Sequence, residues 1–133
     1  MDAHSKAVAE ASIRASEDDS LTFPVQLGQL AQAGFESYYM DFRRSVRIFY
    51  RPDGEALELA TTPVAASMPL VFDAPSVGSA VRQSQAGTHT YKDFCRKVVT
   101  AGCAGYLVSI PGRRVVYFGR TGETHVEHFP PAP

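Results

Sequence analysis

The chain has 133 residues and a formal net charge of −1 at pH 7, so it fits one domain and lacks the strongly positive field typical of nucleic-acid-binding proteins. No apolar run approaches the ~18 residues of a membrane-spanning helix, and the first twenty residues are too polar for a secretory signal. Cys95 and Cys103 are too few for a disulfide framework and too far apart for a CxxC motif. We therefore expect a cytoplasmic protein with buried thiols, no cofactor, no membrane partner and no nucleic-acid partner.

Four helices are predicted from apolar residues at helical spacing and from residues that cap helix ends. Thr22 and Asp73 are candidate N-caps, and Pro24 falls in a first turn, where its missing N–H costs nothing. Thr90 and Asp93 resemble a capping box, with Asp in place of Glu. The expected helices are 5–17, 23–33, 74–86 and 91–101. The buried stripe of the second helix is expected to comprise Phe23, Leu27, Leu30 and Ala31.

Six strands are predicted where the apolar period changes from 3.6 to 2. Residues 52–54 (PDG) and 111–113 (PGR) are turn signals, because Pro presets φ and Gly accepts a positive φ. The expected strands are 37–42, 46–51, 56–60, 105–110, 114–119 and 124–129. Residues 61–72 are expected to form a packed connector, and residues 130–133 a frayed tail.

The predicted elements recur when the chain is shifted by 68 residues. Residues 33–34 then fall on 101–102 (both AG), and Tyr38 falls on Tyr106. The sequence therefore predicts an α+β fold in which two tandem α-α-β-β repeats form one mostly antiparallel sheet packed by helices. The expected repeats are about 5–60 and 73–129, within a single domain. The alternative is two unrelated segments that share turn chemistry.

The last predicted strand departs from its counterpart in the first half. Leu57 and Leu59 are replaced by His125 and Glu127, which share one face of a strand because they are two residues apart. A histidine beside a carboxylate can hold a tuned proton, and a nearby arginine can clamp an anion. The candidate ligand-binding residues are Tyr117, Arg120, Glu123, His125 and Glu127. The alternative is a charged edge strand that discourages aggregation; no catalytic residue and no metal site is assigned.

Both faces of the predicted sheet are apolar, which points to an assembly. The residues concerned are Tyr39, Phe49, Leu107, Val115 and Tyr117. A sheet covered on one side alone usually shows cleaner alternation. Either helices cover both faces, or one face meets a second subunit or a ligand. We therefore expect a homodimer or a protein partner.

The C-terminal third carries a family resemblance. The matching segments are 115–123 (VVYFGRTGE), 126–127 (VE), 129–130 (FP), the AG-x-x-x-Y spacing over 101–106, and 91–95 (YKDFC). In these segments the chain resembles the YdfO-like family of small bacterial and prophage-encoded proteins, some of which bear the label "phage envelope protein". The resemblance implies a small α+β fold. It implies no activity, so no catalytic residue is transferred.

Two functional hypotheses follow from the sequence. The first is a non-enzymatic cytoplasmic accessory protein that binds a protein partner or itself, since both sheet faces are apolar and no catalytic motif is present. The alternative is a small-molecule-binding protein or hydrolase-like enzyme with a polar site on the C-terminal hairpin. That alternative requires His125 and Glu127 to line a concave pocket with Arg120 within reach.

Overall fold

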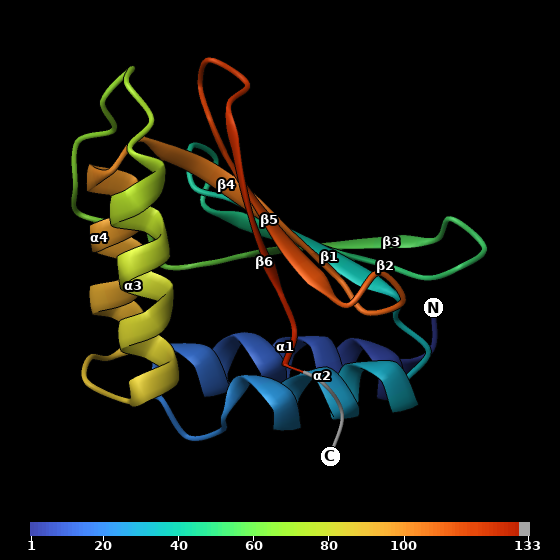
Figure 1. The fold of residues 1–133 in the computed structure, drawn as a ribbon. Coiled ribbons are helices and arrows are strands. Elements are labelled where there is room, and N and C mark those ends of the chain that lie inside the picture. The colour runs from blue at the N-terminus through green and yellow to red at the C-terminus, as the bar shows by residue number, and fades with distance from the viewer. Residues whose placement is uncertain (131–133) are drawn as a thin grey trace.

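The computed structural model describes residues 1–130 and has two layers, four helices and one six-stranded antiparallel sheet (Figure 1). The elements are α1 (Ala3–Glu17), α2 (Phe23–Gln32), β1 (Ser37–Asp41), β2 (Val46–Tyr50), β3 (Ala56–Ala60), α3 (Ala74–Ala86), α4 (Tyr91–Thr100), β4 (Cys103–Ser109), β5 (Arg114–Gly119) and β6 (Thr124–His128). The predicted α+β class and single antiparallel sheet are confirmed. Most of the predicted tail, residues 131–133, lies outside the described residues.

The strand order is β3-β2-β1-β4-β5-β6, so β1 and β4 pair at the centre and β3 and β6 form the edges. Tyr39 of β1 lies opposite Leu107 of β4. Each half of the chain therefore contributes three consecutive strands, which extend outwards from this central pair. The antiparallel hairpins within each half need only short turns.

The helix ends follow the predicted capping with one exception. The Asp73 carboxylate accepts a hydrogen bond from the Ser76 N–H, and Thr90 with Asp93 forms a reciprocal capping box. Thr22 occupies the N-cap position of α2, but its side chain makes no capping hydrogen bond, so that prediction is wrong. Pro24 at the second helical position removes one of the two N–H donors that a Thr22 hydroxyl could serve.

The predicted buried stripe of α2 is only partly correct. Leu30 is buried, but Ala31 is exposed and Phe23 is 39% exposed. The chain buries Gln26 instead, whose side-chain oxygen accepts hydrogen bonds from two serine hydroxyls of α1, those of Ser12 (3.1 Å) and Ser16 (3.0 Å). Gln26 is therefore buried because of a polar contact between the two helices, and a search for apolar residues at helical spacing does not find it.

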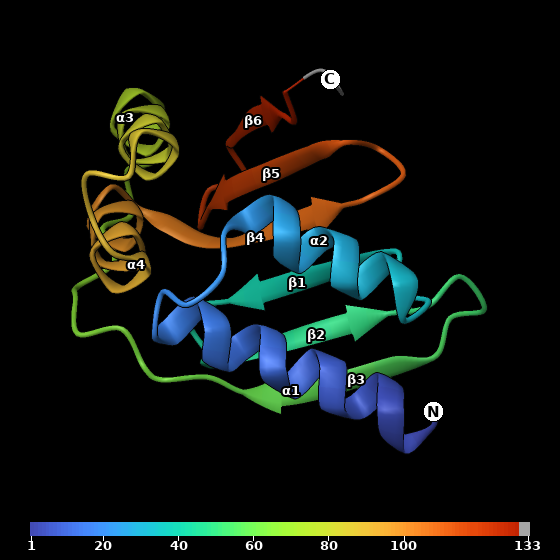
Figure 2. The same ribbon diagram turned by 90° about the horizontal axis from the view of Figure 1, so that it is seen from below.

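The helices cover one face of the sheet, which we call the covered face. Helices α1 and α2 lie across it, and α3 and α4 lie at one end (Figures 1 and 2). One row of side chains crosses this face, with one member from each strand in sheet order: Leu59, Arg47, Met40, Tyr106, Tyr117 and His125. Cys95 and Cys103 are buried free thiols near this row, as predicted.

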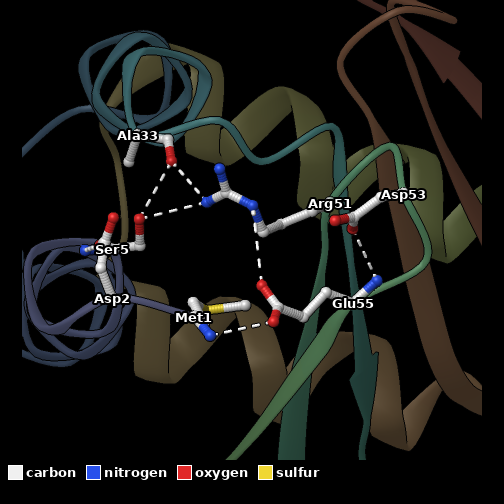
Figure 3. Close-up of polar contacts among 7 residues, drawn as sticks. All are labelled: Met1, Asp2, Ser5, Ala33, Arg51, Asp53 and Glu55. Carbon is white, nitrogen blue, oxygen red and sulfur yellow. Dashed lines mark hydrogen bonds and ion pairs between the residues drawn. The ribbon is translucent and has the colours of Figure 1, made fainter.

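Arg51, in the β2–β3 turn, makes polar contacts with both N-terminal helices (Figure 3). Its Nη1 donates to the Ala33 carbonyl oxygen at the end of α2 (2.9 Å) and to the Ser5 hydroxyl of α1 (3.1 Å). Its Nε lies 3.9 Å from the carboxylate of Glu55, which also accepts from the terminal ammonium of Met1 (2.9 Å). This one side chain therefore links two helices with the β2–β3 turn.

Candidate functional site

The His125–Glu127 pair of β6 lies on the covered face, beside α3. His125 Nε2 is 2.8 Å from Glu127 Oε1, and Arg82 of α3 lies 4.0 Å from the same oxygen. Both side chains are about one-quarter exposed. β6 is an edge strand, as the alternative interpretation expected, but these two residues point towards a helix rather than into bulk solvent.

Of the other three candidate residues, Tyr117 lies beside this pair, and Arg120 and Glu123 do not. Tyr117 is buried, with its ring centroid 6.4 Å from that of His125. Arg120 donates to the Met68 carbonyl oxygen (3.3 Å), and Glu123 accepts from a neighbouring threonine in the β5–β6 turn. None of the five candidates lines either of the two cavities described in residues 1–130. Their assignment as a ligand site stays a prediction.

The face of the sheet opposite the helices, which we call the open face, carries an apolar row. Its members, in sheet order from β2 to β6, are Ile48, Tyr39, Leu107, Val116 and Val126. Leu107 is 38% exposed and Val126 is 39% exposed. The ring of Tyr39 in this row stacks on that of Phe118, with centroids 5.8 Å apart, beside Gly105, where a Cβ would meet the Phe118 ring and the Tyr39 hydroxyl. Ile48, Tyr39 and Val116 are half-buried. A partly exposed apolar row that spans five strands is typical of an interaction surface.

A buried arginine on the covered face was not identified from the sequence. Arg47 is 1% exposed, and its Nη2 donates to the Tyr91 hydroxyl (2.8 Å). The Tyr91 and Tyr106 hydroxyls are also 2.8 Å apart, and the guanidinium lies 4.8 Å from the centre of the Tyr38 ring. The available signal was its spacing from Phe49, two residues along β2, which puts an arginine on the core face of a strand.

In residues 1–130, no acidic side chain forms an ion pair with the positively charged Arg47 of this cluster. Burial raises the pKa of both Tyr91 and Tyr106, so both hydroxyls stay neutral at ordinary pH. Burial alone would lower the pKa of Arg47, but the tyrosine hydroxyls around it outweigh that effect and raise it. Arg47 therefore remains a cation surrounded by neutral aromatic side chains.

Residues 1–130 contain no cluster of three His, Cys, Asp or Glu side chains suited to a metal ion. Within the same range, no helix has both the length and the apolar character needed to cross a membrane. The two candidate sites are therefore the open face and the arginine–tyrosine cluster.

Comparison with known proteins gives relatives without an assigned activity. The chain is similar to uncharacterised proteins of Mycobacterium bovis and of two strains of Mycobacterium tuberculosis, with 33% identity over 58 residues. The match covers 44% of this chain and 35% of each relative, so the chain matches about a third of the length of these proteins. No family model matches the chain.

Proposed function

We propose that this chain is a non-enzymatic cytoplasmic accessory protein that binds a second copy of itself through the open face. The observation that carries the proposal is the apolar row of the open face, which no helix of residues 1–130 covers. Two such sheets can stack about 10 Å apart with interdigitating side chains, as in a β-sandwich. Burial of the row would remove its apolar surface from water, which favours association.

The charges around the row favour one arrangement of the two copies. Glu58 lies at the β3 edge of the open face, paired there with the exposed Arg44, whereas Arg114 and His128 lie towards the β6 edge. The Asp41 carboxylate is occupied by backbone N–H groups of the β1–β2 turn. A two-fold axis parallel to the central strands sets the β3 edge of one copy over the β6 edge of the other, so that Glu58 faces the basic side chains.

Sedimentation velocity over a range of concentrations tests the proposal. The wild-type chain is expected to sediment as a dimer, and Leu107→Lys as a monomer, because the substitution places a charge in the centre of the apolar row. Val71→Lys is the matched control, since Val71 is an exposed valine of the connector, away from the open face. A wild-type monomer at all concentrations, or a Leu107→Lys dimer, would overturn the proposal.

We also propose that the two halves arose by tandem duplication. Each β-hairpin register in the first half recurs 68 positions later; Val46 opposite Ala60 in β2–β3 corresponds to Arg114 opposite His128 in β5–β6. The non-glycine residues with positive φ at the hairpin turns, Ser45 (53°) and Arg113 (51°), have the same offset in sequence. An experimental structure in which these registers differ between the halves would contradict the duplication.

The resemblance to the YdfO-like family remains a proposal of the same kind, and it adds no activity. The mycobacterial relatives are themselves uncharacterised. Small-molecule binding remains the second candidate function. The observation that favours it is a cavity lined by the buried Arg47, not the His125–Glu127 pair from which the sequence suggested it.

A further inference from the structure

A cavity of about 370 Å³ lies between the covered face and the connector that follows β3. Its walls come from the end of α1, from β1 and β2, from the start of α4, and from residues 61–65. The connector runs from the end of β3 towards α4 (Figure 2), and its residues 61–65 line one side of the cavity. The volume is at the lower end of the range for small-molecule sites, about 300–1,000 Å³. It suits a compact metabolite rather than a nucleotide.

The unpartnered buried side-chain atoms of residues 1–130 belong to two residues of the cavity wall. In residues 1–130, three buried side-chain nitrogen or oxygen atoms lack a hydrogen-bond partner: Nε and Nη1 of Arg47, and Oγ1 of Thr61. Both residues line the cavity. Buried polar groups are nearly always hydrogen-bonded, so each exception needs an explanation. Acceptor atoms of a ligand in this cavity would give these donors the partners that they lack.

Among the described residues 1–130, no carboxylate forms an ion pair with Arg47. The single carboxylate in the cavity wall, that of Glu17, accepts the Thr62 N–H (2.9 Å) and forms no ion pair with Arg47. Tyr91, the remaining polar partner, is neutral and already shares its hydroxyl with Tyr106. One buried positive charge with two unpartnered nitrogen atoms, Nε and Nη1, therefore lies in the wall of the cavity.

Contacts with the aromatic rings do not by themselves compensate the cost of burying the positive charge of Arg47. A desolvated cation over an aromatic face gains about 2 kcal/mol, and the Tyr38 and Tyr91 rings lie 4.8 and 5.8 Å from the guanidinium carbon. Burying an unpaired ion costs several kcal/mol even after the protein relaxes. An anion that binds beside Arg47 would offset the difference.

The rest of the cavity wall defines the remainder of the ligand. Ile13, Met40, Val64 and Pro63 present apolar surface. Lys92 and Arg96 also contribute to the wall, and their positive charge would draw an anion towards the cavity. Lys92 and Arg96 are exposed, so Arg47 is the buried cation of this wall. One buried cation beside apolar surface matches a single small anionic group on an apolar body.

We propose that this cavity binds a compact apolar monocarboxylic acid. Its carboxylate accepts hydrogen bonds from Arg47 and Thr61, and its hydrocarbon part lies against Ile13 and Met40. A phosphate ester is disfavoured, because its extra oxygens and second charge would need more buried donors than the cavity offers. The site lies on the covered face, so it is independent of association through the open face.

Isothermal titration calorimetry with benzoate, hexanoate, benzamide and phenyl phosphate tests the proposal on the full chain. Benzoate or hexanoate is expected to bind, and benzamide, which has the same shape without the charge, at least about tenfold more weakly. Arg47→Met is expected to lose carboxylate binding. Arg44→Met is the matched control, because Arg44 is exposed and lies outside the cavity.

A second variant keeps the test decisive if Arg47→Met fails to fold. Thr61→Phe leaves Arg47 in place and puts an aromatic ring in the wall of the cavity. The position 68 residues later already holds an aromatic residue, Phe129, whose ring packs against Phe23. This variant is expected to abolish binding while it remains folded. No binding of either acid at millimolar concentration, unchanged binding in Thr61→Phe, or benzamide binding equal to benzoate overturns the site. Tighter binding of phenyl phosphate than of benzoate overturns the carboxylate assignment.

Discussion

Replacing Arg51 by methionine should destabilise the fold far more than the same change at Arg44. Methionine keeps most of the length and apolar stem of arginine but removes the guanidinium. At position 51 this deletes the hydrogen bonds to the Ala33 carbonyl and the Ser5 hydroxyl, which join α1 and α2 to β2 (Figure 3). At position 44 it deletes one exposed ion pair with Glu58.

The magnitude follows from these contacts. A hydrogen bond to a charged group contributes about 1.5–3 kcal/mol. The two bonds of Arg51 are partly exposed, and Ser5 retains its own bond to the Ala33 carbonyl. The 3.9 Å contact with Glu55 is at the surface and adds only about 0–1 kcal/mol. We expect Arg51→Met to lower the free energy of unfolding by about 2–4 kcal/mol, and Arg44→Met by about 0–1 kcal/mol.

Urea unfolding followed by circular dichroism measures both changes. The slope of free energy against urea concentration should stay the same in the two variants, since neither alters the surface exposed on unfolding. Equal losses at positions 51 and 44 would refute the reasoning, because they would mean that the contact with α1 and α2 contributes no more than a surface ion pair.

Three further predictions address the interface, the thiols and a helix cap. Leu107→Ala should raise the dimer dissociation constant about tenfold in sedimentation equilibrium. Leu107 is 38% exposed in a single copy, and the dimer would bury this surface in each of its two copies. An unchanged constant would exclude Leu107 from the interface. Burial raises the pKa of the Cys95 and Cys103 thiols to about 11, so both should resist Ellman's reagent at pH 8 until the chain unfolds, and rapid reaction of the folded protein would contradict this. Hydrogen bonds from the Thr90 N–H, the Thr90 hydroxyl and Arg96 hold the pKa of Asp93 below its ordinary value. The ionised Asp93 carboxylate therefore stabilises the fold above pH 4, and this stabilisation is lost as the pH falls through the lowered pKa. Asp93→Asn should reduce the loss of stability at acid pH, and an unaltered loss would count against the capping box.

Much of the fold could be predicted because local rules decide it. The spans of α3, β3 and β5 agree with the expected ranges, since proline, glycine and period-2 alternation mark those elements directly in the sequence. The Thr90–Asp93 capping box was predictable for the same reason, because its two partners are three residues apart. The α2 stripe was not, since the burial of Gln26 depends on two serines of another helix.

The candidate sites also were predictable only where local spacing in the sequence determines them. Alternation placed Leu107 and Tyr39 on an apolar face, but only the sheet order aligns them in one row. His125 and Glu127 do form a pair, as their spacing implied, yet Arg120 is held by the connector, which is distant in sequence. Arg47 was not identified from the sequence because the feature that marks it is the lack of an ion pair with any carboxylate of residues 1–130. Whether a side chain has a partner is known only once the chain is folded.

Cross-linking between copies tests the central claim most directly. Glu58→Cys protein is mixed with Val126→Cys protein and treated with a short bismaleimide; the native thiols are buried and should not react. The proposed dimer sets β3 of one copy over β6 of the other, so the account predicts a cross-linked product that contains one chain of each variant. A mixture that yields no cross-linked product, or only products that join two chains of the same variant, would contradict it.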